Sequence, residues 1–298
     1  MHPLEWPVWL GLAVLWCYGS LPWRWVHRSG NVLGRLLAPL LSVRAQVAKR
    51  NLQLCFPEID ASERASLLAA NLRNTGHMLG EFAFAWMASR NALLRVPGRF
   101  SGVEHLQQAL ARGRGVLLAG VHLSHLELCG RITSQQLAPA PMAGLYREHA
   151  SAAFEWAIKR RRLRYAGAMF RRDELRGALR WLKAGNILWY APDQEYKRGD
   201  SLFVPFFGLP AATLTATHQL AKLSGAAVIG FAHKRLADGS FEISFAPALE
   251  DFPSSDARLD TERVNQLLEA AIRQAPEQYL WLHQRFKTRP PGEAKLYD

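Results

Sequence analysis

The chain has 298 residues, and its 37 Lys and Arg against 25 Asp and Glu give a net charge of +12 that favours anionic partners. A chain of this length can bury a sizeable core as one domain, and no tandem repeat or low-complexity segment divides it. Its three cysteines stand at unrelated spacings, which excludes a disulfide framework and indicates a reducing compartment. Zinc-knuckle, recognition-helix and aromatic RNA-binding motifs are absent from the sequence, so we expect no nucleic-acid partner.

The N-terminal segment predicts contact with a membrane. Residues 6–23 carry no charge, are rich in Trp, and are near the lower length for crossing a bilayer. Since the chain starts Met-His-Pro-Leu-Glu, without the basic start of a secretory signal, we expect a retained membrane-anchoring helix. Basic residues follow, with no acid until Glu58, so the positive-inside rule places the bulk of the protein in the cytoplasm. A helix lying in the membrane interface and an apolar core helix remain alternatives.

The rest of the sequence predicts an α/β fold, with a mixed central sheet flanked by helices. Residues 61–90 predict a helical pair whose aromatic residues pack in the core. Expected strands are 96–102, 116–119, 141–146, 167–170, 187–191, 226–233 and 241–247. Expected helices are 104–112, 151–164, 173–183, 213–224 and 260–274, and residues 204–208 are expected to form an apolar loop. We therefore divide the chain into a membrane anchor (1–28), a helical lead-in (29–95) and a single α/β domain (96–298).

The segment from Gly115 to Arg131 is the best candidate for chemistry. His122 follows the buried strand 116–119 just ahead of a helix, and open α/β sheets bind ligands at this end of their strands. On one continuous helix Glu127 would lie about 140° around the axis from His122, but a backbone bend would let the two side chains meet. A carboxylate bonded to one ring nitrogen leaves the other as a base. We therefore predict that His122 and Glu127 form a catalytic pair that removes a proton from a hydroxyl.

Other interpretations of this segment stay open. Ser124 is a good helix N-cap, and residues 124–127 fit a capping box, in which Glu127 would have only a structural role. His122, His125 and Glu127 suggest a metal site, but helical zinc motifs need histidines four residues apart, so we predict no metal and no cofactor. Cys129, a lone cysteine on an apolar helix face, is more typical of buried packing than of a nucleophile.

Two further regions carry candidate binding residues. The helix 151–164 holds the densest positive charge of the chain, at residues 159–162 and Arg164. Adjacent cations repel one another, which favours an anionic ligand such as a phosphate over a merely solvated face. Asp193 lies at the carboxyl end of the strand 187–191, where the same rule places ligands, although an Asp beside a Pro is also typical of a turn.

These residues carry a resemblance to a known family. His-x-x-x-x-Glu after Gly-Val-Leu-Leu resembles the His-x4-Asp/Glu motif of glycerolipid acyltransferases. Three longer segments of the sequence are similar to the lipid A late acyltransferases, most of all to the lauroyl-transferase type. They are Gly-Val-His-Leu-Ser-His-Leu-Glu-Leu-Cys-Gly-Arg, Ala-Pro-Asp-Gln at 191–194 and Pro-Glu-Gln-Tyr-Leu-Trp-Leu-His-Gln-Arg-Phe-Lys-Thr-Arg-Pro at 276–290. The similarity runs from about Arg50 to the C-terminus.

The resemblance implies an enzyme of the bacterial inner membrane, with its catalytic domain on the cytoplasmic side. It would move a lauroyl-like chain from acyl carrier protein to a hydroxyl of a Kdo-bearing lipid A precursor, forming a secondary acyloxyacyl ester. By the same resemblance Arg162 matches a required arginine, Arg147 matches a further basic position, and Asp193 belongs to the site. Arg131, at the end of the motif, and Arg164, in the basic helix, complete the predicted substrate-binding set.

Two other functions remain possible from the residues. One is an acyltransferase of the same superfamily that acts on another glycerolipid or a mannolipid, and the other is a non-catalytic membrane protein that binds lipid. The similarity of the C-terminal segment speaks against both. Periodicity alone predicts a solvated end for the basic tail with Arg285, Lys287 and Arg289, whereas the resemblance suggests a role at the site or at lipid head groups.

Overall fold

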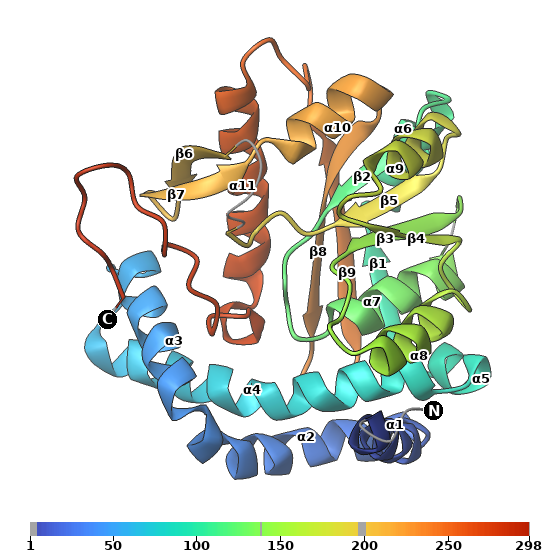
Figure 1. The fold of residues 1–298 in the computed structure, drawn as a ribbon, viewed down its shortest axis with the longest axis vertical. Coiled ribbons are helices and arrows are strands. Elements are labelled where there is room, and N and C mark those ends of the chain that lie inside the picture. Colours follow the sequence, from blue (N-terminus) through green and yellow to red (C-terminus); the bar gives the residue numbers. More distant parts are fainter. Residues whose placement is uncertain (1–4, 138, 196–200, 298) are drawn as a thin grey trace.

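The computed structural model describes residues 5–137, 139–195 and 201–297, and a seven-stranded sheet forms its centre (Figure 1). The strands stand in the order β1-β9-β8-β2-β5-β3-β4, in which only β8 and β9 are antiparallel neighbours. They are β1 (Gly98–Ser101), β2 (Val116–Ala119), β3 (Met142–Tyr146), β4 (Ala168–Arg171), β5 (Ile187–Tyr190), β8 (Ala227–Arg235) and β9 (Phe241–Ala248). The predicted mixed sheet with flanking helices is confirmed.

The central strand β2 divides the core into two layers because its side chains alternate between the faces of the sheet. Val116 and Leu118 pack with one set of helices, and Leu117 and Ala119 pack with the other. The first set contains α4 (Ala61–Met87), α6 (Val103–Ala111) and α7 (Leu126–Ile132). The second set contains α9 (Leu175–Lys183), α10 (Ala216–Ser224) and α11 (Ala257–Gln274). All four β2 side chains are buried, as expected for a parallel strand covered on both faces.

Helices at the N-terminal end of the chain lie along the outer side of α4, with α2 beside it in Figure 1. They are α1 (Trp6–Gly19), α2 (Trp23–Leu37), the short η2 (Ala38–Leu41) and α3 (Ser42–Cys55). Small residues allow α2 to approach α4 closely, since a Cβ on Gly76 would lie only 2.1 Å from the backbone nitrogen of Gly34. Pro22 separates α1 from α2, so the uncharged run 6–23 is not one helix.

Among the described residues, no helix combines the length and the apolar character needed to cross a bilayer. Residues 1–4 of the predicted anchor lie outside the part that the structure describes.

Three predicted elements differ from the structure. Residues 61–90 form one long helix, α4, followed by the short α5 (Arg90–Leu94). The expected loop at 204–208 belongs to a hairpin of β6 (Ser201–Phe206) and β7 (Leu209–Leu214), whose turn has positive φ at Phe207 and Gly208. Two consecutive positive φ values give the twist that a tight hairpin needs. Because β7 uses residues 213–214, α10 begins at Ala216 rather than at 213.

Candidate active site

His122 and Asp193 meet because they follow neighbouring parallel strands. In the register of β2 and β5, Ala119 pairs with Tyr190, and each strand is followed three residues later by one of the two side chains. The N–H of Gly120 continues this pairing by donating to the Tyr190 carbonyl at 2.9 Å. The carboxyl ends of both strands therefore deliver an imidazole and a carboxylate to the same edge of the sheet.

The Asp193 carboxylate orients the His122 ring at two points. Its Oδ1 lies 2.6 Å from His122 Nδ1, and its Oδ2 accepts the backbone N–H of His122 at 3.0 Å. Burial tends to raise the pKa of Asp193, but the His122 charge and hydrogen bonds from His122 and Tyr279 outweigh it, so the pKa lies below its usual value. The ionised carboxylate places the ring proton on Nδ1 and leaves Nε2 as the base. The His122 side chain is 28% exposed, so a substrate can reach it.

The loop of His122 is held by a segment close to the C-terminal end of the described chain. The Leu280 N–H donates to the His122 carbonyl at 3.0 Å, and Leu123 forms an isolated antiparallel bridge with Tyr279. Asn71 of α4 in turn donates to the Tyr279 carbonyl at 2.7 Å. Backbone hydrogen bonds to this C-terminal strap, residues 276–281, therefore fix the conformation of the loop that carries His122.

Glu127 does not hold the His122 imidazole, so that prediction is wrong. Both of its oxygens bind Arg162 of α8 (Ala152–Arg162), with one distance of 3.2 Å from Nε to Oε2. Oε2 also accepts Trp86 Nε1 at 3.0 Å and the Tyr165 hydroxyl at 3.2 Å. Glu127 points away from His122 because α7 begins at Leu126, and this start directs the Glu127 side chain toward α8 and α4. Glu127 thus forms a second polar centre with Arg162.

The capping-box interpretation is also wrong. The N-cap of α7 is His125 and not Ser124, and the His125 side chain makes no capping bond. The Ser124 hydroxyl instead lies 3.1 Å from His125 Nδ1, while Glu127 is engaged by Arg162. The carboxylate of Glu127 therefore binds Arg162, Trp86 and Tyr165 and does not cap the helix terminus.

The predicted substrate-binding arginines separate into three environments. Arg162 is 8% exposed, and although burial lowers its pKa, the Glu127 charge more than compensates and raises it. Arg131 is buried and donates to three carbonyls at the C-terminal end of α4, those of residues 84, 85 and 88. Its prediction as a substrate ligand is wrong because the helix end takes up its guanidinium. Arg147 and Arg164 are exposed and stay predictions.

An apolar pocket opens beside the Glu127–Arg162 pair. It encloses about 490 Å³, part of which is open to solvent, between α7 and the strands β3 and β5. Its lining includes Leu126, Met142, Gly144, Leu145, Met169 and Trp189. The arrangement places the Glu127–Arg162 ion pair at the edge of a space that accepts a hydrocarbon group.

Several contributors to the site carry no local sequence signal. Trp86 and Tyr165 bind Glu127, and Tyr279 binds Asp193, yet each resembles an ordinary core aromatic in the sequence. Arg285 is not part of a solvated tail, since it is buried and donates to the Ala212 carbonyl and to Thr213 Oγ1, both at 2.7 Å. The similarity of the C-terminal segment could have identified Tyr279 and Arg285, because both lie within residues 276–290.

We expect Glu127→Ala to lower the free energy of unfolding by about 3–5 kcal/mol, because it leaves the buried Arg162 guanidinium without its counter-charge. Urea unfolding measures the effect. Adding Arg162→Met to this variant should recover part of the loss by removing the unpaired charge. Glu262→Ala is the control, since its exposed pair with Arg258 should contribute less than about 1 kcal/mol. Equal losses for Glu127→Ala and Glu262→Ala would contradict the structural importance of the buried pair.

Comparison with known proteins gives one family over almost the whole chain. The family described as "Bacterial lipid A biosynthesis acyltransferase" matches residues 1–288. The chain is 40% identical over 299 residues to "Lipid A biosynthesis palmitoleoyltransferase" and 38% identical over 299 residues to "Lipid A biosynthesis lauroyltransferase", both from Escherichia coli (strain K12). Each comparison covers 100% of this chain and 96% of the relative.

Among solved structures, a 1-acyl-sn-glycerophosphate acyltransferase from Thermotoga maritima is similar with a TM-score of 0.40 and 14% identity. That comparison covers 84% of this chain and 96% of the other.

Proposed function

From the premise that this chain belongs to the bacterial lipid A biosynthesis acyltransferase family and is an acyltransferase, we propose that it esterifies a hydroxyl of a Kdo-bearing lipid A precursor with a lauroyl-like chain. The donor is acyl carrier protein, whose acidic surface suits a chain of net charge +12. The product is a secondary acyloxyacyl ester. The observation that carries the proposal is the His122–Asp193 pair at the carboxyl edge of the sheet, in a member of this family.

The proposed reaction is a direct transfer. His122 Nε2 takes the proton from the acceptor hydroxyl as its oxygen attacks the carbonyl carbon of the thioester. The tetrahedral intermediate then collapses, the carbon–sulfur bond breaks, and the imidazolium returns the proton to the leaving thiolate. Asp193 stabilises the charged ring throughout, because its carboxylate is bonded to Nδ1. Positioned base catalysis of this kind contributes about 10²- to 10⁴-fold in rate.

The second polar centre serves the substrate in this proposal. Arg162 is held by Glu127 at the pocket and supplies a cation for an anionic substrate group or for the developing oxyanion. Exposed Arg147 and Arg164 supply further positive charge for the phosphates or carboxylates of the acceptor. Glu127 thus acts through Arg162, and His122 acts with Asp193.

A mass-resolved assay of the detergent-solubilised chain tests the function. The chain is incubated with a lipid A precursor and with acyl carrier protein that carries acyl chains of different length. Mass spectrometry then measures the mass of each product. A gain of one acyl chain establishes the transfer and its preferred length. The function is wrong if no donor gives a gain, and an equal gain on a glycerolipid acceptor would favour the other enzyme class.

The apolar pocket is the proposed site of the donor chain. A Cβ on Gly144 would lie 3.1 Å from Met169 Cε, so a larger side chain at Gly144 narrows the space. We expect Gly144→Ile to reduce kcat/KM for the longest accepted donor by about 10- to 200-fold for each methylene that no longer fits the pocket. Shorter donors in the same assay are the internal control and should keep their rates. A uniform loss with all donors would place the acyl chain elsewhere.

The N-terminal helices are the proposed membrane anchor, lying on the cytoplasmic face of the inner membrane. Large apolar side chains are exposed on α1, α2 and η2, namely Trp6, Leu10, Val14, Trp16, Trp25, Val32, Leu36 and Leu40. Basic residues of the same region, Arg24, Arg28 and Arg35, add attraction to anionic lipids. α1 also contacts α8 through Trp9 and Trp156, whose rings are 5.9 Å apart, which brings the helix of Arg162 beside this surface.

We expect Leu10→Glu with Leu36→Glu to weaken binding to anionic vesicles by about 100-fold or more, because each buried Leu contributes about 1.5–3 kcal/mol. Both side chains are more than 60% exposed in the structure. Sedimentation with vesicles measures the effect. Leu223→Glu with Leu259→Glu is the control on α10 and α11, at leucines that are also exposed, by 55% and 48%. Equal weakening by the two double variants would contradict this anchor.

A further inference from the structure

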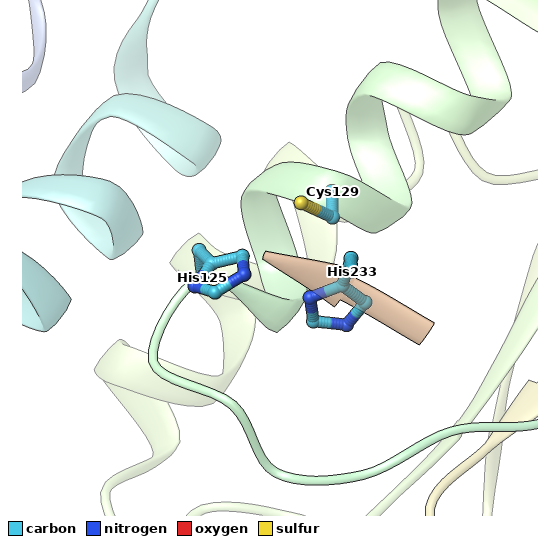
Figure 2. A group of neighbouring side chains, drawn as sticks. All are labelled: His125, Cys129 and His233. Carbon is cyan, nitrogen blue, oxygen red and sulfur yellow. The ribbon is translucent and has the colours of Figure 1, made fainter. Parts of the chain in front are cut away.

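A cluster of His125, Cys129 and His233 lies buried between α7 and β8, outside the proposed catalytic centre (Figure 2). His125 and Cys129 are four residues apart at the start of α7 and so share one face of the helix, while His233 reaches them from β8. One nitrogen or sulfur atom of each residue lies within 4.8 Å of the others. The side chains are almost fully buried, with exposed fractions of 0%, 0% and 2%.

Packing alone does not satisfy the polar atoms of these rings. Within the described part of the chain, neither nitrogen of His233 has a hydrogen-bond partner, and the same holds for Nε2 of His125. Nδ1 of His125 lies 3.1 Å from the Ser124 hydroxyl, and the His125 ring also faces the backbone of His233. A neutral imidazole has one donor and one acceptor nitrogen, so both functions of His233 are lost on burial. Unsatisfied buried groups of this kind need an explanation such as an ion.

We propose that His125, Cys129 and His233 bind one Zn²⁺ ion. Two imidazole nitrogens and one thiolate are ligands that zinc takes in proteins. Tetrahedral coordination at about 2.0–2.3 Å places donor atoms roughly 3.3–3.8 Å apart, so small side-chain rotations would suffice to close the cluster on the ion. With three protein ligands, a water molecule would take the fourth position. The site differs from the one considered from the sequence, because its third ligand comes from β8 and not from His122 or Glu127.

Proton and charge balance are consistent with this site. On binding, the Cys129 thiol releases its proton to solvent and its sulfur bonds the ion, while both imidazoles bind in the neutral form. The neighbouring charges are Glu81 and Arg235, which bind one another, and Asn74 also binds Arg235 at 2.6 Å. Oε2 of Glu81 has no partner among the described residues, and the Glu81 charge acts on Cys129. Glu81 and Arg235 neutralise one another, so the ion with one thiolate and two neutral imidazoles keeps a single positive charge.

The proposed ion would stabilise the contact between α7 and β8. The ion joins the start of α7 to β8, and α7 is the helix that carries Glu127 two residues beyond the first ligand. A buried ion with protein ligands fixes the end of the catalytic loop without taking part in acyl transfer. Since the cluster is fully enclosed, the ion enters as the chain folds.

The test refolds the full chain from denaturant and chelator with Zn²⁺, with Co²⁺ or with neither. We expect one Zn²⁺ per chain after gel filtration, a higher Tm with zinc, and a thiolate-to-cobalt charge-transfer band in the Co²⁺ sample. Absence of bound metal, or a cobalt spectrum without a thiolate band, would overturn the proposal.

Variants locate the ion. Loss of a residue that only hydrogen-bonds a zinc ligand weakens zinc binding by roughly 10- to 100-fold. Cys129→Ser and His233→Phe each remove a ligand itself, so each should weaken binding by more than this. Cys55→Ala is the matched control, being a buried cysteine on α3, and Cys17→Ser removes the exposed thiol. Both controls should keep one ion per chain. Zinc content that is unchanged in Cys129→Ser, or lost in Cys17→Ser, would contradict this site, and if a ligand variant fails to fold, the cobalt spectrum of the unaltered chain decides.

Discussion

Transfer by His122→Ala should fall by about 10²- to 10⁴-fold in kcat, because the variant loses the only group proposed to accept the hydroxyl proton. The fold of the loop should persist, since the backbone N–H of residue 122 still donates to Asp193 and its carbonyl still accepts from Leu280. Initial rates with the preferred acyl carrier protein thioester, compared at equal amounts of folded protein, measure the loss.

A second histidine–aspartate pair provides the control. His218 Nδ1 lies 2.7 Å from Asp260 Oδ2, but both side chains are buried at 3% and 0% between α10 and α11, where no substrate reaches them. We expect His218→Ala to lower the Tm while the turnover of the folded fraction stays unchanged. Turnover by His122→Ala above about one tenth of the unaltered rate would remove the base assignment.

Asp193→Asn should lower kcat by about 10³- to 10⁴-fold with little change in KM. An amide of the same shape carries no charge to stabilise the imidazolium, and it favours the wrong ring tautomer, which costs about 10⁴-fold in the serine-protease triad. The effect separates the two carboxylates of the site, because Asp193 acts on His122 and Glu127 acts on Arg162. Steady-state kinetics on both variants, Asp193→Asn and Glu127→Gln, measure the difference.

Nitrogen-15 spectra of the His122 ring give a readout that a purely structural role would not change. The unaltered protein should show the proton on Nδ1, and Asp193→Asn should shift ring protons toward Nε2. The role of Asp193 is wrong if only Glu127→Gln changes the tautomer. It is equally wrong if Asp193→Asn keeps full kcat.

Local signals were sufficient for most elements and placed both His122 and Asp193 at the site, although Asp193 was predicted to bind substrate and not to pair with His122. Apolar runs bounded by turns predict β2 and β5, and both His122 and Asp193 stand just beyond the carboxyl ends of these strands. Their contact could not be predicted, because it depends on β2 and β5 being neighbours in the sheet. Strand order comes from long-range packing, and periodicity along the chain contains no measure of it.

The errors also arise where distant residues decide a local choice. Glu127 binds Arg162 because α7 begins at Leu126, beyond the buried His125, whereas the sequence favoured a start at Ser124. Arg131 is buried because it donates hydrogen bonds to the free carbonyls at the end of α4, a helix that ends some forty residues earlier in the chain. In each case the tertiary partner outweighs the intrinsic preference of the segment.

The C-terminal strap supports the loop of His122 only after nearly all of the chain has been synthesised. Asn71 and Tyr279 are hydrogen-bonded although 208 residues separate them, and the same strap holds the carbonyl of His122. The strands of the sheet can emerge and begin to pair on the ribosome, but the loop that carries the base stays unsupported until residues 276–281 have been made. Contacts over such separations form slowly. If the N-terminal helices bind the membrane as proposed, nascent chains reach it before the loop of His122 is supported.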